Sequence, residues 1–214
     1  MLILCLTACN QRPSDTIADK PNFIFIMADD LGYGDIGVYG HGPMKNMSTT
    51  EFFNSSGPLR GAKRDLYEGG IREPFIVKWP GKIAAGSTSD YLGGFWDMLP
   101  TLLDFAGHPV PQSIDGISMR PVMTGQPGQK YHPYLYWEFH EGTGAQAIRQ
   151  GQWKGVKLEV KQEPNAPMEL YNLTADIAET HNVADKYPDK VIELEALMNN
   201  ARTPSKEFPL AVDN

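Results

Sequence analysis

The sequence predicts an α/β fold that ends in a small antiparallel sheet covered by a helix. Two continuous apolar runs, residues 22–28 and 74–80, are typical of strands buried on both faces of a parallel sheet. Residues 133–160 instead alternate apolar and polar side chains, as antiparallel strands with one buried face do. Residues 188–201 then place apolar side chains at helical spacing.

The composition indicates a globular protein without a nucleic-acid surface. The 214 residues are enough for one large domain or two small ones, and contents of 41% hydrophobic and 10% aromatic residues are ordinary for a folded chain. The net charge is −7, and the chain has no dense block of Lys and Arg. Because binding to a nucleic-acid backbone needs clustered cations, we expect no nucleic-acid partner.

The first twenty residues differ from the rest. A short apolar run ends in Leu6-Thr7-Ala8-Cys9, and residues 10–20 are polar. This pattern resembles the signal peptides of bacterial lipoproteins, in which the cysteine carries a lipid. The alternatives are an ordinary signal peptide and a buried apolar strand. We expect an exported protein of the bacterial periplasm or cell envelope, anchored to the membrane through Cys9. Cys5 is the only other cysteine, so no disulfide, thiolate metal site or cysteine nucleophile is expected after processing.

The central part of the chain predicts loops and one helix. Residues 31–51 are rich in Gly, Ser, Thr, Met and Asn without periodicity, which predicts a loop. Residues 90–107 predict a helix that ends at Gly107, and Pro100 either kinks it or marks the first turn of its main part. The apolar face of this helix consists of Phe95, Leu99, Leu102, Leu103 and Ala106.

The C-terminal part predicts a sheet and a helix that are contiguous in sequence. Strand patterns occupy residues 133–140, 146–160 and 168–173. The apolar face of the helix over residues 188–201 consists of Val191, Leu194, Leu197 and Met198. Gly, Pro and Gln cluster at residues 125–130, which predicts a boundary there. We therefore divide the chain into residues 1–20, 21–128 and 129–214.

Two adjacent carboxylates follow the first apolar run. Asp29 and Asp30 stand where a strand would end, beside flexible glycines. Open α/β sheets hold their ligands at the carboxyl ends of strands, and paired carboxylates suit a hard cation such as Ca²⁺ or Mg²⁺. The alternative is a turn, in which Asp residues are common.

A basic, glycine-rich segment precedes the second apolar run. Arg60, Lys63, Arg64 and Arg72 lie among paired glycines in residues 54–74. An ammonium group and backbone N–H groups on such a loop can converge on an oxyanion. The alternative is a solvated basic loop whose neighbours are Asp65 and Glu68.

Two long motifs resemble the sulfatase family, a branch of the alkaline phosphatase-like fold. "PNFIFIMADDLGYGDIGVYG" is similar to the family's N-terminal metal-binding segment, and "GPLRGAKRDLYEGGIREPFIVKWPGKI" to its sulfate-contacting lysine segment. The stretches "DMLPTLLDFAG", "DGISMRPVMTG", "YLYWEF", "QWKGVK" and "ELYNLTADIAETHNVAD" resemble the sulfatase C-terminal half in the family's order. The resemblance runs from Lys20 to about Lys190.

The resemblance implies roles for three residues. Asp29 and Asp30 match the family's first two ligands for Ca²⁺ or Mg²⁺. Lys63, in the pattern K-x-x-x-x-E-G-G, matches the lysine that binds the sulfate group. Its role would be to neutralise charge on the ester oxygens as the S–O bond breaks.

The same resemblance shows a gap. Sulfatases attack with a formylglycine made from Cys/Ser-x-Pro-x-Arg, and this motif does not follow the DDLG loop here. Ser56-Gly57-Pro58-Leu59-Arg60 fits the pattern formally but belongs to the lysine segment. The stretch CNQRPS, which begins at Cys9, holds the residue types of the motif in the wrong order. Gly40 and His41 stand where the family has an Asp-Asn ligand pair.

We therefore expect a partial alkaline phosphatase-like (sulfatase) fold: an incomplete α/β domain at residues 21–128 and a C-terminal sulfatase subdomain at 129–214. Formylglycine is not encoded, and we expect no hydrolysis of sulfate esters by this chain alone. Without its missing neighbours, residues 22–28 should expose apolar surface.

Two alternatives remain open. The first is a non-catalytic surface protein that binds sulfated glycans or a protein partner through Arg60, Lys63 and Arg64. Trp137 and Trp153 would then stack on sugar rings or, alternatively, serve packing. The second is a phosphatase or phosphodiesterase of the same superfamily that uses a hydroxyl nucleophile from Ser48, Thr49 or Thr50.

Overall fold

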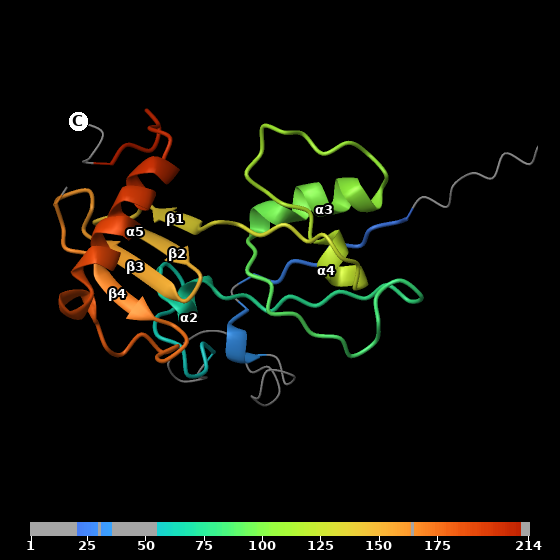
Figure 1. The fold of residues 1–214 in the computed structure, drawn as a ribbon, viewed down its shortest axis with the longest axis horizontal. Coiled ribbons are helices and arrows are strands. Elements are labelled where there is room, and N and C mark those ends of the chain that lie inside the picture. Colours follow the sequence, from blue (N-terminus) through green and yellow to red (C-terminus); the bar gives the residue numbers. More distant parts are fainter. Residues whose placement is uncertain (1–20, 30, 36–54, 164, 211–214) are drawn as a thin grey trace, which may run out of the picture.

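The computed structural model of the protein describes residues 21–29, 31–35, 55–163 and 165–210. Figure 1 shows two groups of elements: a four-stranded sheet with α5 and α2, and a second group that contains α3, α4 and two long extended segments. The chain crosses between the groups where α2 is followed by the extended residues 72–79 and again just before β1.

The sheet is an antiparallel meander. Its strands are β1 (Leu135–Phe139), β2 (Ala145–Gln150), β3 (Trp153–Leu158) and β4 (Glu169–Asn172), in the order β1-β2-β3-β4. The sequence pattern at residues 146–160 forms two strands rather than one, because Gln150 pairs with Trp153 and leaves a two-residue loop. Gly151 begins this loop with φ 58°, which suits a tight hairpin turn. The predicted small antiparallel sheet is confirmed.

Both faces of the sheet are covered. Helix α5 (Pro188–Ala201) lies over one face, where its fully buried Leu194 and Met198 pack with Ile148 and Leu170. The predicted helix over residues 188–201 is therefore confirmed. The opposite face packs against the segment that leads into the short helix α2 (Glu68–Ile71), through these buried residues: Leu66, Tyr67, Ala147, Val156, Tyr171 and Leu173.

The second group contains the predicted central helix. A 3-10 turn, η3 (Phe95–Asp97), continues into α3 (Met98–Phe105), and Gly107 follows with φ 70°. Pro100 lies in the first turn of α3, so it starts the helix rather than kinking it. Helix α4 (Arg120–Thr124) packs nearby. The remaining short turns are η1 (Tyr33–Asp35) and η4 (Ala184–Lys186).

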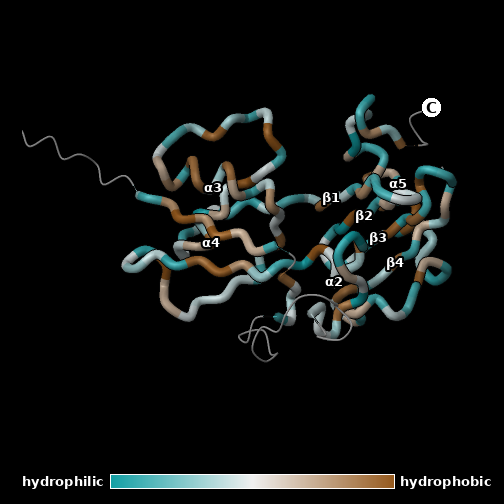
Figure 2. Tube along the Cα trace, turned by 180° about the vertical axis from the view of Figure 1, so that it is seen from behind, coloured by the Kyte–Doolittle hydropathy of each residue, from teal (hydrophilic) through white to brown (hydrophobic). Residues whose placement is uncertain are grey.

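The prediction of buried strands at residues 22–28 and 74–80 is wrong. Neither segment is a strand in the described structure, and both are solvent-exposed along their apolar residues. Exposure reaches 89% at Ile24 and 65% at Ile76. The physical reason is that a strand requires a partner edge, and no strand is paired to either segment. The expectation that residues 22–28 expose apolar surface is confirmed by these exposures. Figure 2 shows the hydrophobic character of the segment.

Candidate anion-binding site

Lys63 lies at the tip of a tight turn formed by residues 62–65, here called the lysine turn. The backbone N–H of Asp65 donates to the carbonyl of Ala62 at 2.9 Å, and the N–H of Ala62 donates to Asp65 Oδ2 at 2.9 Å. Arg64 adopts φ 82°, a left-handed conformation that is uncommon outside glycine. The turn is therefore closed from both ends, and Lys63 is exposed to solvent.

The two glycines after Glu68 let the lysine turn pack directly on α2. A Cβ at Gly69 would lie 2.5 Å from the carbonyl oxygen of Gly61, and one at Gly70 would lie 2.2 Å from that of Asp65. The N–H of Gly69 also donates to the carbonyl of Arg60 at 2.7 Å. The Glu-Gly-Gly sequence is thus required by the close approach of two backbones.

Ser56 has a structural role in the same loop. Its hydroxyl lies 2.9 Å from the carbonyl oxygen of Gly61 and 3.2 Å from that of Gly69, both in donating geometry. This contact ties the start of the loop to α2. It supports the interpretation that Ser56, although it fits Ser-x-Pro-x-Arg, belongs to the lysine segment.

A buried group of charges fixes α2 to the sheet. Lys154 on β3 is fully buried, and its Nζ lies 2.9 Å from Glu68 Oε1 and 2.9 Å from Glu179 Oε1. Glu68 Oε2 also pairs with Arg72 at 2.6 Å and with Arg149 at 3.2 Å. We call Glu68, Arg72, Arg149, Lys154 and Glu179 the ionic clamp. Because α2 directly follows the lysine turn, the clamp sets the position of Lys63 relative to the sheet.

Burial and charge act differently on the two carboxyl groups of the clamp. Burial by itself raises the pKa of Glu68, but Lys154 and Arg72 outweigh it and hold that pKa below its ordinary value. Burial raises the pKa of Glu179, and Lys154 only partly offsets this effect. Glu179 also accepts a hydrogen bond from the backbone N–H of Glu68 at 2.6 Å. The two carboxylates therefore share Lys154 as a countercharge, and Glu68 also has Arg72 and Arg149.

Arg60 is held by aromatic residues. Its guanidinium lies 3.7 Å from the centre of the Tyr67 ring and donates to the Tyr171 hydroxyl at 2.7 Å and to the Glu179 carbonyl at 3.0 Å. The hydroxyls of Tyr67 and Tyr171 both donate to Glu169 Oε2, at 2.6 and 2.8 Å. Arg60 thus serves mainly to attach the loop to β4.

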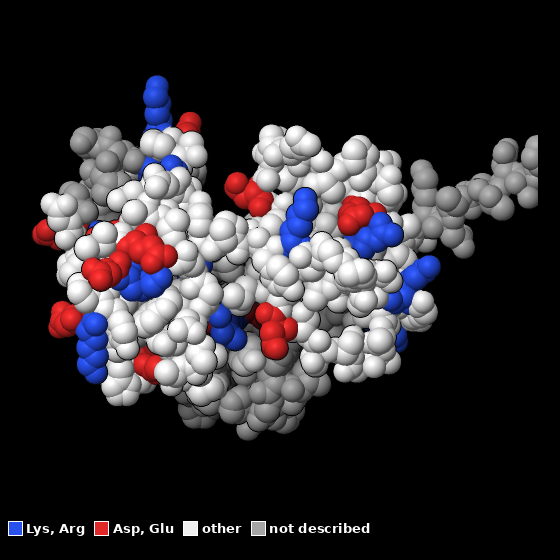
Figure 3. All heavy atoms as spheres, in the orientation of Figure 1, with Lys and Arg blue, Asp and Glu red and all other residues white. Residues whose placement is uncertain are grey.

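The other predicted contact residues are also placed. Arg64 pairs with Glu141 at 3.4 Å, an exposed ion pair that solvent screens. Trp137 packs beside Ala147 in the core, and Trp153 packs on Tyr187 with ring centres 4.9 Å apart. These contacts favour the packing role of the two tryptophans. On the face seen in Figure 3, basic and acidic side chains lie next to one another rather than in a block of one sign.

The described residues do not assemble a metal site. Asp29 is exposed, and Asp30 lies outside the described ranges. Nowhere in the described part of the chain do three His, Cys, Asp or Glu residues gather as metal ligands would. Ca²⁺ takes six to eight oxygen ligands, more than Asp29 alone can give. The predicted Ca²⁺ or Mg²⁺ ligation by Asp29 and Asp30 stays a prediction.

Several other predictions fall outside the described ranges. Cys9, Gly40, His41 and residues 48–50 lie there, so the lipid anchor and the hydroxyl nucleophile stay predictions. Among the helices that are described, none has the length and apolar character needed to cross a membrane.

Comparison with known proteins identifies the class of this fold. Residues 61–203, more than half of the 214-residue chain, match the family described as N-sulphoglucosamine sulphohydrolase, C-terminal. Mouse N-acetylgalactosamine-6-sulfatase is 32% identical over 162 residues, which is 73% of this chain and 30% of the relative.

Two solved structures share the fold. One comes from work on the metabolism of multiple glycosaminoglycans by Bacteroides thetaiotaomicron. It matches with a TM-score of 0.57 at 27% identity, and the matched region is 77% of this chain and 33% of the solved chain. The other was solved in complex with its substrate D-glucosamine-2-N,6-O-disulfate. It matches with a TM-score of 0.51 at 29% identity, and the matched region is 59% of this chain and 27% of the solved chain.

The chain therefore belongs to the sulfatase family, and its fold is a partial α/β sulfatase fold. It spans about 30% of the length of the curated relatives that it matches.

Proposed function

We propose that this chain carries the sulfate-recognising lysine segment of a sulfatase, that it binds sulfate groups of glycans through Lys63, and that it does not hydrolyse sulfate esters on its own. The observation that carries the proposal is the fixed lysine turn: residues 62–65 are closed by two hydrogen bonds and packed on α2, which the ionic clamp attaches to the sheet. Because the backbone of this turn is already ordered, binding of an anion by Lys63 does not have to order the loop.

The chemistry of Lys63 fits this role. An exposed ammonium on a short, fixed turn can donate N–H groups to the oxygens of a sulfate group. A relative of the same fold was solved with a sulfated glucosamine as its substrate, which supports a sulfated sugar as the ligand class. Hydrolysis needs a nucleophile, and the formal Ser-x-Pro-x-Arg match after the DDLG loop, residues 56–60, belongs to the lysine segment, where the Ser56 hydroxyl bonds to backbone carbonyls. No step of the proposal uses a metal ion.

Binding to heparin, compared with chemically desulfated heparin, tests the recognition part. With a net charge of −7, the protein as a whole repels both polymers, so binding depends on local cations. We expect salt-sensitive binding to heparin alone, and Lys63→Ala should raise the Kd about tenfold, the loss of one charge-assisted hydrogen bond. Lys82→Ala, which removes another exposed lysine from a turn, is the matched control and should change little. Equal binding of the two polymers would refute sulfate recognition.

A chromogenic aryl sulfate with added Ca²⁺ tests the catalytic part. We expect no turnover above the background rate. Turnover that disappears in Lys63→Ala would show that the chain is an active sulfatase and that our proposal of inactivity is wrong.

A further inference from the structure

The second group of elements presents an apolar surface, here called the open face. It consists of residues 22–28, residues 75–79 and the exposed apolar residues Phe95 and Leu99 at the start of α3. Contacts hold its parts together: the Phe25 and Phe95 rings are 6.0 Å apart, and the Trp79 and Phe105 rings are 4.9 Å apart. Figure 2 shows both extended segments as hydrophobic stretches beside α3.

Residues 22–28 are exposed on both sides of the chain. Ile24 and Ile26 are 89% and 86% exposed, and the alternating residues Phe23 and Phe25 are 43% and 51% exposed. Successive side chains of an extended segment point to opposite faces, so neither face of this segment is fully covered. An occupant that buried the whole segment would contact it from two sides.

The backbone of the open face also lacks partners. Within the described ranges, no backbone–backbone hydrogen bond involves residues 22–28 or 74–78. An occupant that buries these residues must therefore supply partners for the peptide groups as well as cover the apolar side chains. A lipid surface would cover the side chains but would offer nothing to the peptide N–H and C=O groups. A polypeptide strand satisfies both, as in recognition by strand addition.

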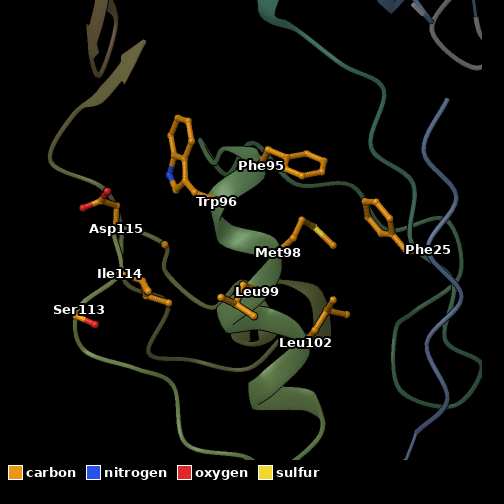
Figure 4. A pocket seen from close by; sticks show the side chains of 10 residues that line it. Phe25, Phe95, Trp96, Met98, Leu99, Leu102, Ser113, Ile114 and Asp115 are labelled. Atoms are coloured by element: carbon orange, nitrogen blue, oxygen red, sulfur yellow. The ribbon is translucent and has the colours of Figure 1, made fainter. Parts of the chain in front are cut away.

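A hollow next to the segment accepts apolar side chains. Its volume is about 620 Å³, and apolar residues from both the extended segment and α3 line it, including Phe25, Phe95, Met98, Leu99 and Leu102. Figure 4 shows Phe25 and the residues of α3 around this hollow. Large apolar side chains on an incoming strand or helix could fill it.

We propose that the open face binds a second polypeptide by strand addition, and that this partner is the part of a sulfatase chain that has no counterpart here. The curated relatives are about three times as long as the region they share with this chain, so they contain ample additional chain for both faces. The inference rests on membership of the sulfatase family and not on sulfate binding by Lys63.

Co-expression tests the proposal. The probe is the part of the Bacteroides thetaiotaomicron glycosaminoglycan-metabolism protein outside its matched 33%, produced as a separate chain beside the full 214-residue protein. Size-exclusion chromatography with light scattering should show a complex with one copy of each chain. Hydrogen–deuterium exchange at residues 22–28 and 74–78 should slow at least tenfold in the complex.

Two variants with equal exposure localise the contact. Ile76 on the open face and Ile192 on α5 are both 65% exposed. Ile76→Lys should weaken the complex at least tenfold, and Ile192→Lys should leave it unchanged, while circular dichroism reports equal folding of both. If both variants weakened the complex equally, the partner would not bind at the open face.

Three outcomes overturn the proposal: no complex with the probe, protection of residues 22–28 by self-association of this chain alone, and protection only by phosphatidylcholine vesicles. Since none of these measurements uses a sulfated ligand, failure here is distinguishable from failure of the Lys63 proposal.

Discussion

Lys154 is the single cation on which both buried carboxylates of the ionic clamp depend. It is fully buried, and 2.9 Å separate its Nζ from an oxygen of each carboxylate. A buried ion pair is not by itself a large source of stability, because desolvation of the charges opposes their attraction. Removal of Lys154 is nevertheless costly, since it leaves Glu179 buried without its cation. Glu68, in contrast, keeps Arg72 and Arg149.

Lys154→Met should lower the free energy of unfolding by about 3–5 kcal/mol, the cost of stranding buried charge. Lys157→Met is the matched control. It lies on the same strand and pairs with a glutamate at 3.2 Å, but Glu195 is 37% exposed. The control should lose no more than about 1 kcal/mol. Urea denaturation measures the free energy of unfolding of both variants. Similar losses of stability would show that removing the buried Lys154 costs no more than removing the partly exposed ion pair of Lys157.

The pH dependence of stability should reflect Glu68. Its pKa in the folded protein lies below its ordinary value of 4.5, because Lys154 and Arg72 outweigh the effect of burial. A lowered pKa contributes stability that is present above pH 4.5 and is lost as pH falls through the folded pKa. Glu179 contributes with the opposite sign, since its pKa is raised.

Glu68→Gln should therefore flatten the loss of stability below pH 4.5. Denaturant titrations at pH 6, 5, 4 and 3.5 on both proteins measure the slope. A mutant whose stability falls as steeply as that of the wild type over this acid range would contradict the assignment.

The sequence could locate Lys63 but not the ionic clamp. Lys63 and the Glu-Gly-Gly pattern lie within eight residues, so a local motif contains them. Glu68 and Lys154 are 86 residues apart, and Glu68 and Glu179 are 111 apart. Nothing in their local spacing signals an ion pair, because the pairing arises only when α2 meets the sheet. The sequence therefore leaves open a solvated loop with Glu68 as its neighbour, whereas Glu68 is buried in the structure.

At the scale of elements, α5 stabilises the sheet through a narrow apolar stripe. Leu194 and Met198 are fully buried, whereas Ile192, on the same helix, is 65% exposed. Helices of this kind gain most of their stability from the packed face rather than from helix propensity.

Leu194→Ala should lower the free energy of unfolding by about 2–5 kcal/mol, through lost burial and the cavity that remains. Ile192→Ala on the exposed side of α5 should change it by no more than about 0.5 kcal/mol. Thermal denaturation followed by circular dichroism compares the two. Equal effects would mean that α5 does not pack as described.

Elements whose backbone hydrogen bonds are made with neighbours in sequence were predicted better than elements that need a partner strand from a distant part of the chain. Helix α5 draws its hydrogen bonds from neighbours in sequence, so the helical spacing was sufficient to predict it. The alternating pattern located the sheet but predicted one strand over residues 146–160, where β2 and β3 form a hairpin. The run NFIFIMA has the composition of a buried strand, but composition supplies no partner edge. The same apolar residues that predicted burial now make up the open face.

At the scale of the whole molecule, stability should be uneven. The sheet, α5 and the α2 segment share buried cores, whereas residues 22–28 and 74–78 have no backbone–backbone hydrogen bonds among the described residues. Hydrogen exchange is slow where amides are hydrogen-bonded inside a cooperative core.

We expect amides of residues 22–28 and 74–78 to exchange at nearly unfolded-chain rates, and those of β2 and β3 to exchange at least a hundredfold more slowly. Exchange detected by mass spectrometry at peptide level measures this difference in the isolated protein. Comparable protection of the two extended segments and of β3 would contradict the described structure.

The ionic clamp can form only late in synthesis, after its C-terminal residues have been made. The ribosome makes Glu68 86 residues before Lys154 and 111 before Glu179. At roughly 5–20 residues per second, α2 waits on the order of 4–20 seconds before its partner charges exist. The lysine turn thus reaches its final place only after the C-terminal half has left the exit tunnel. The apolar NFIFIMA segment is made before any of the clamp residues, so it is exposed in the nascent chain throughout this interval.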